Sequence, residues 1–185
     1  MKPLQSIAMG FVILALFARV GDYDLLADPL GWLLVIAGVR RLPASYERRT
    51  TLVWVAGLAL VVSVPLWFPG VVDALGREDA SLAWTADLPG FAFVALLFHE
   101  LAAVAATARD RWAERICAVL VTATGVVAAL PVLVFGAGYD SWSDPAAAAA
   151  ELLRVATIIA LFGYAGRAWA EPANPDSAAD PVDSS

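Results

Sequence analysis

The chain has 185 residues, of which 61% are hydrophobic and only 16% are charged, and its formal net charge is −6. Soluble domains contain about 45–50% apolar and about 25% charged residues, so this composition excludes an ordinary water-soluble protein. The mean hydropathy of +0.73 indicates lipid as the solvent of most side chains. We therefore predict an all-α integral membrane protein, folded as a helical bundle.

Six apolar segments approach the roughly 20 residues that a helix needs to cross the bilayer core. They are Leu4–Val20, Pro29–Val39 with its flanks, Thr51–Phe68, Pro89–Ala108, Ile116–Phe135 and Ala146–Trp169. The first two are short and the sixth depends on its alanine run, so five crossings are the alternative to six. Residues 1–170 are predicted to form one bundle. The acidic, proline-broken segment 171–185 is predicted to be a disordered cytoplasmic tail.

The linkers between these segments alternate in charge. The linker before Pro29 carries three aspartates and no basic residue, whereas Arg40–Arg49 carries four arginines and Arg109–Arg115 carries three. Basic residues beside a span mark its cytoplasmic end. The pattern predicts a multi-pass cell-membrane protein with six crossings and both termini in the cytoplasm. One lysine against eleven arginines favours a GC-rich bacterial genome as the source.

Three of the predicted helices begin with an aspartate followed closely by proline. These openings are Asp28-Pro29, Asp87-Leu88-Pro89 and Asp144-Pro145, and we predict that Asp28, Asp87 and Asp144 cap helices at their outer ends. The sequences DPLGW and DLPGF match further, because each places glycine three residues and an aromatic four residues after the aspartate. An internal duplication, as in many transporters, is one explanation. Ordinary helix-start chemistry is the other.

The segment LLADPLGWLLVIAGVRRL, Leu25–Leu42, resembles a stretch of uncharacterised multi-pass membrane proteins of Gram-positive, actinobacteria-like bacteria. In those proteins a Leu-Pro-Asp-x-x-Gly-aromatic opening leads into an apolar helix that ends with glycine and basic residues. Asp28, Gly31 and Trp32 match this opening, whereas Ala27 replaces the proline. The likeness covers about 18 residues. It implies an integral membrane protein and brings no activity or site with it.

The only histidine, His99, stands beside Glu100 in the middle of the predicted fourth span. Ionisable residues at such depth are costly and usually have a partner inside the bundle. Because the neighbours of His99 on its helix face are mostly alanines, we predict that His99 lies in a tight seam between helices, with Glu100 at its edge or against a cavity. The pair is either a proton relay or a polar bridge between helices.

Two further charged residues, Glu151 and Arg154, lie one helical turn apart in the predicted sixth span and can pair with each other. The sequence allows two other arrangements of the Arg154 side chain. It could reach Glu100 if the fourth and sixth spans touch, or extend to the lipid headgroups. If Arg154 reaches Glu100, the carboxylate of Glu100 is ionised and held in place. This arrangement favours a structural role for His99 and Glu100.

Several enzyme classes lack the residues that they require. A zinc peptidase needs His-Glu-x-x-His, but the fifth position is Ala103, and the lone Cys117 offers no second ligand. No Gly-x-Ser-x-Gly elbow or phosphate-binding glycine loop is present in the sequence. We therefore assign no catalytic residue, metal or cofactor, and the basic loops show no features of nucleic-acid binding.

The remaining interpretation is a non-enzymatic membrane protein, a subunit or scaffold of an assembly. The alternative is a small proton-coupled transporter or channel that uses His99 and Glu100. The predicted partners are the lipid bilayer and either further copies of the chain or other membrane subunits.

Overall fold

The computed structural model describes residues 1–16, 19–20, 23–24, 28–66, 80–136 and 142–170. Six α-helices account for most of these residues. They are α1 (Pro3–Ala15), α2 (Asp28–Arg40), α3 (Arg49–Leu66), α5 (Ala80–Thr107), α6 (Arg111–Gly136) and α7 (Ser143–Tyr164). A short 3₁₀ helix, η2 (Ala168–Ala170), follows α7. The only strands among the described residues are β1 (Arg19–Val20) and β2 (Tyr23–Asp24), which pair antiparallel. The predicted all-helical bundle is confirmed at this level.

Four helices are long and apolar enough to cross a membrane. Their candidate spans are Arg49–Leu66, Trp84–Thr107, Arg111–Val132 and Asp144–Tyr164. Helices α1 and α2 have 13 residues each, which corresponds to about 20 Å at 1.5 Å per residue. That length is below the 30 Å of a typical bilayer core. More than four crossings therefore require α1, α2 or both to cross as short helices.

Four predicted helix boundaries are wrong by five residues or more, and two of them are the start of α6 at Arg111 and the end of α7 at Tyr164. The first helix ends at Ala15 rather than Val20, and the backbone of Leu16 is already extended. The fourth begins at Ala80, nine residues before Pro89, which lies inside α5. Proline costs an interior helix one backbone hydrogen bond, a loss that membrane helices tolerate. The predicted tail 171–185 lies outside the described residues.

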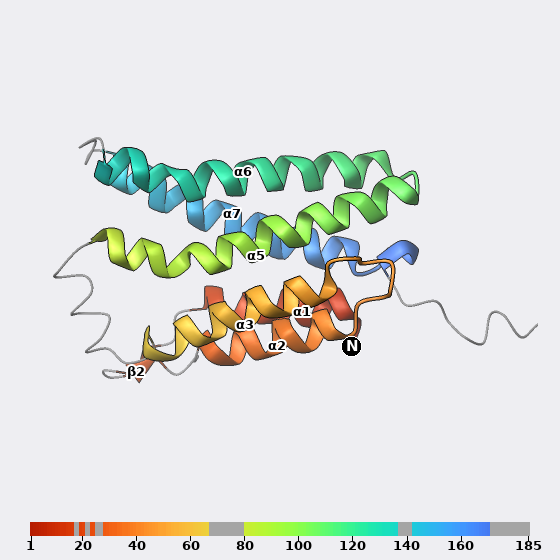
Figure 1. Ribbon diagram of the computed structural model, residues 1–185, viewed down its shortest axis with the longest axis horizontal. Coiled ribbons are helices and arrows are strands. Elements are labelled where there is room, and N and C mark those ends of the chain that lie inside the picture. Colours follow the sequence, from red (N-terminus) through yellow and green to blue (C-terminus); the bar gives the residue numbers. More distant parts are fainter. Residues whose placement is uncertain (17–18, 21–22, 25–27, 67–79, 137–141, 171–185) are drawn as a thin grey trace, which may run out of the picture.

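Helices α1 and α2 pack against each other through glycines, and Figure 1 shows them side by side. A Cβ atom added to Gly10 would lie 2.6 Å from the carbonyl oxygen of Gly31. A Cβ added to Gly38 would lie 2.6 Å from Cγ1 of Ile7. Because glycine has no Cβ, the two backbones can approach closely at these positions, as they do where membrane helices meet at small residues.

An aromatic cluster forms the core where α1, α2 and α5 meet. Phe11, Trp32 and Phe93 come from these three helices, and their ring centroids lie 5.7 to 6.1 Å apart. The ring of Trp32 stands edge-on to the other two, an arrangement that aromatic quadrupoles favour. The cluster fixes the α1–α2 pair against the longer helix α5.

The basic segments of the chain gather at one end of the bundle. Figure 1 shows the N-terminus, the α2–α3 loop, the α5–α6 turn and η2 together on the right. We call this the basic end and define it as residues 1–3, 40–49, 107–115 and 164–170. Nine of the twelve basic residues lie there: Lys2, Arg40, Arg41, Arg48, Arg49, Arg109, Arg111, Arg115 and Arg167.

Candidate functional site

His99 and Glu100 occupy the opposite environments from those predicted. His99 is exposed on the outer face of α5, together with Ala92 and Ala103, whereas Glu100 is buried with 6% exposure. The buried face of α5 carries the large side chains, among them Phe93 and Leu97. Burying these side chains removes more apolar surface than burying alanine does, so the alanine face of α5 turns outward.

Glu100 joins α5 to the start of α3. Its Oε2 accepts a hydrogen bond from the backbone N–H of Arg48 at 3.1 Å, and its Oε1 lies 3.7 Å from Nε of the same residue. The side chain of Arg48 is 53% exposed, so the buried carboxylate meets a half-solvated guanidinium. Arg48 directly precedes α3, where a negative charge is stabilised by the unpaired N–H groups of the helix N-terminus. These contacts make Glu100 a polar bridge between helices.

The same contacts place Glu100 beside the α2–α3 loop, which belongs to the basic end. It lies seven residues before Thr107, the last residue of α5, which is about 10 Å along the helix axis. Because α5 begins at Ala80 rather than near Pro89, Glu100 lies nearer the C-terminal end of this helix than its middle. Tyr46, in the adjoining α2–α3 loop, is also buried, and burial raises the pKa of its hydroxyl.

Arg154 pairs within its own helix. Its Nη1 lies 3.2 Å from Oε1 of Glu151, which confirms that these two residues can pair. The structure does not join Arg154 to Glu100, whose cationic partner among the described residues is Arg48. The side chain of Arg154 is partly buried and that of Glu151 is 62% exposed. Both line a cavity.

This cavity, of about 450 Å³, lies between α1, α2, α3, α5 and α7. Its charged lining residues are Asp28 from α2, Asp87 from α5, and Glu151 and Arg154 from α7. None of these residues belongs to the basic end. The cavity thus brings four charged side chains together among helices that are otherwise apolar.

The two matching motifs, DPLGW in α2 and DLPGF in α5, both contribute residues to the wall of this cavity. Asp28 and Trp32 line it from α2, and Asp87 and Phe91 line it from α5. Gly90 belongs to the second motif, and a Cβ added to it would lie 3.5 Å from Cζ2 of Trp32. The sequence revealed the likeness of the two motifs but not that both face one space.

Two polar groups in the cavity wall have no partner among the described residues. They are Nε1 of Trp84 and Oγ1 of Thr157, and Thr157 is only 1% exposed. A buried donor without a partner costs free energy. The wall of the cavity therefore contains two buried polar groups whose hydrogen-bonding capacity is unused.

The three predicted caps have different positions. Asp28 is the first residue of α2, and Asp144 lies in the first turn of α7, where Trp142 holds the N-cap position. The prediction that Asp87 caps a helix is wrong, because it lies inside α5. An acidic residue in the first turn still interacts favourably with the positive end of the helix dipole.

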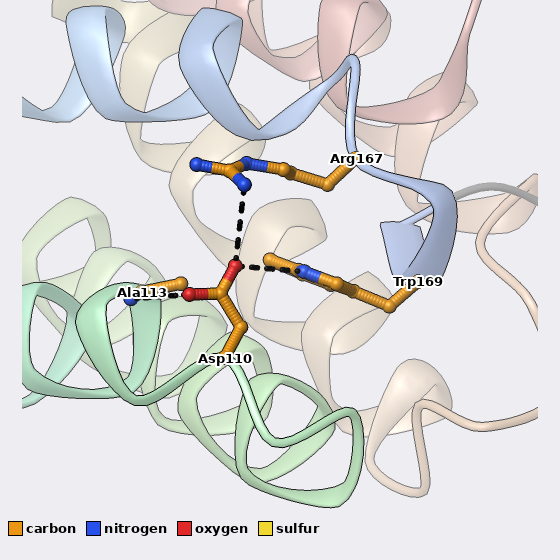
Figure 2. A network of polar contacts seen from close by, with 4 residues as sticks. All are labelled: Asp110, Ala113, Arg167 and Trp169. Atoms are coloured by element: carbon orange, nitrogen blue, oxygen red, sulfur yellow. Dashed lines mark hydrogen bonds and ion pairs between the residues drawn. The ribbon is translucent and has the colours of Figure 1, made fainter.

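Asp110 forms a second polar cluster at the basic end, shown in Figure 2. Its Oδ1 accepts the backbone N–H of Ala113 at 3.1 Å, which caps α6. Its Oδ2 accepts Nε1 of Trp169 at 3.3 Å and lies 3.6 Å from Nη1 of Arg167. Through these contacts, Asp110 links the segment after α7 to the α5–α6 turn. This cap was not predicted from the sequence, although an aspartate directly before a helix is a cap signal.

The hydrogen bond from Ala113 is the main cause of a lowered pKa at Asp110, and Trp169 and Arg167 lower it further. Because the folded state lowers this pKa, the contribution to stability is present above the pKa of the unfolded chain. It is lost as the pH falls through the pKa of the folded state. The backbone before Asp110 turns at Arg109, whose φ of 60° ends α5 in the left-handed conformation.

Within the described residues, no group of three or more His, Cys, Asp or Glu side chains is placed to hold a metal ion. The chain matches no protein-family model, no curated protein and no solved structure.

Proposed function

We propose that the protein is a multi-pass protein of the cell membrane with six crossings and both termini in the cytoplasm. The clustering of basic residues at one end supports this orientation, because such residues mark the cytoplasmic side. Helices α1 and α2 would cross as a closely packed pair, and local thinning of the bilayer accommodates short spans at modest cost. In this orientation the cavity opens towards the outer face.

We further propose that the protein binds a small solute in this cavity, as a small secondary transporter does. The observation that carries the proposal is the convergence of Asp28, Asp87, Glu151 and Arg154 on one cavity of about 450 Å³. Ionisable side chains in membrane segments usually face a cavity and mark a solute pathway. The volume falls within the roughly 300–1,000 Å³ of small-molecule sites. A proton relay through His99 and Glu100 stays a prediction, whereas the contacts of Glu100 support its role as a bridge.

Cysteine accessibility tests whether the cavity admits water. In a Cys117→Ala background, Ala148→Cys places a thiol on the cavity wall and Val126→Cys places one on the outward face of α6. With the protein in lipid nanodiscs, we expect a charged maleimide to modify Ala148→Cys at least tenfold faster than Val126→Cys. Equal rates, or the reverse order, would contradict a water-filled cavity in an apolar bundle.

The other function predicted from sequence, a subunit or scaffold of a membrane assembly, also stays a proposal. The outward face of α6 supports it, because Ala118, Thr122, Gly125 and Ala129 are exposed there in one line. Small residues in such a line allow a second membrane helix to approach closely.

A further inference from the structure

We propose that the solute of this cavity is an organic cation, a protonated or quaternary amine with an apolar body. This inference rests on the proposed solute-binding function and adds the chemical class of the ligand. Three carboxylates and one guanidinium line the cavity, so the charges of the lining residues sum to −2 when all four are ionised. A cation is the ligand that such a lining attracts.

Asp87 is the central residue of this inference. Arg154 is paired with Glu151 at 3.2 Å, so its charge is largely satisfied by its own helix. Asp87 forms no hydrogen bond or ion pair with another described residue, although Arg154 and Glu151 are near enough to interact with it electrostatically. Asp87 is an exposed residue of α5, so its carboxylate is accessible to a positively charged ligand.

The aromatic wall fits the same class of ligand. Trp32, Trp84 and Phe91 line the cavity, and Trp84 stacks on Phe91 with ring centroids 5.5 Å apart. The faces of aromatic rings, of tryptophan above all, attract cations, and quaternary ammonium groups are commonly bound in this way. The rings also provide apolar surface for the body of the ligand.

The geometry favours an organic cation over a metal ion. The carboxylates come from three different helices, and no three potential metal ligands in the described part of the chain lie close together. A hard metal ion needs several oxygens within about 2.0–2.6 Å. A larger organic cation can contact Asp87 through its charged group and the aromatic wall through its body.

Calorimetric titration of the full chain in phosphatidylcholine nanodiscs tests the inference, with empty nanodiscs as the blank. The probes are benzyltrimethylammonium and benzylsulfonate, which have similar size and opposite charge. We expect saturable binding of benzyltrimethylammonium, at least tenfold tighter than that of benzylsulfonate. Asp87→Asn should weaken binding of the cation at least tenfold, whereas Asp87→Glu should retain most of it. Asp144→Asn, which changes an aspartate that does not line the cavity, should have no effect.

Each failure has a distinct meaning. Preference for benzylsulfonate, an unchanged affinity in Asp87→Asn, or no saturable binding of either probe would overturn the cation inference. The proposed solute-binding function would survive these results if the thiol of Ala148→Cys still reacts rapidly with maleimide. It would fail together with the inference if that thiol were unreactive. Circular dichroism and size-exclusion profiles equal to wild type establish that the Asp87 variants are folded.

Discussion

Gly10→Ala is expected to destabilise the protein by about 1–3 kcal/mol, the usual range for overpacking a well-packed core. The added Cβ would lie 2.6 Å from the carbonyl oxygen of Gly31 and 2.7 Å from Cγ2 of Val35. The first contact is with backbone, which cannot rotate away, so α1 and α2 must move apart. Unfolding by sodium dodecyl sulfate in mixed micelles, followed by circular dichroism, measures the change in free energy.

The matched control for this prediction is Gly57→Ala in α3. Among the described residues, no atom outside the adjoining backbone of α3 lies within 4 Å of a Cβ placed at Gly57, so alanine fits there without any movement. Alanine in the interior of a helix is favoured over glycine by about 0.5–1 kcal/mol. We therefore expect opposite signs for the two variants. A neutral or stabilising Gly10→Ala would show that α1 and α2 do not approach as closely as described.

Glu100→Ala is expected to lower the free energy of unfolding by about 2 kcal/mol, as measured by the same titration. The variant removes a charged acceptor from the N–H of Arg48, and hydrogen bonds to charged groups contribute about 1.5–3 kcal/mol. The ion pair with the guanidinium adds little to this, because the side chain of Arg48 is half exposed.

Glu151→Ala is the control, since it removes a carboxylate of the same type whose side chain is 62% exposed. Exposed pairs one turn apart on a helix contribute less than about 1 kcal/mol. If Glu100→Ala were no more destabilising than Glu151→Ala, Glu100 would not act as a bridge between α5 and α3. The relay prediction for His99 and Glu100 would then become the stronger of the two.

The helical architecture was predictable because it depends on composition and on the lengths of apolar segments. Helices α2, α3, α6 and α7 lie close to the predicted segments, and each predicted segment contains most of one helix. The start of α5 was missed because Asp87 and Pro89 are typical of a helix start, yet a membrane helix can continue through both. The end of α1 was missed because apolar residues continue beyond Ala15.

The candidate site was less predictable, because it depends on which face of each helix is buried. The alanines beside His99 indicated a tight seam, but the phenylalanines and leucines of the opposite face form the core. Periodicity alone does not rank two apolar faces by the area that each one buries. The matching motifs at Asp28 and Asp87 were visible in the sequence, whereas their meeting at one cavity depends on how α2 packs against α5.

The orientation of the cavity is tested most directly by labelling intact cells with a membrane-impermeant maleimide. Ala148→Cys reports on the cavity and Ser45→Cys reports on the basic end, both in the Cys117→Ala background. We predict that Ala148→Cys is labelled in intact cells, and that Ser45→Cys is labelled only after the membrane is permeabilised. Labelling of Ser45→Cys in intact cells, with Ala148→Cys protected until permeabilisation, would contradict an outward-facing solute cavity.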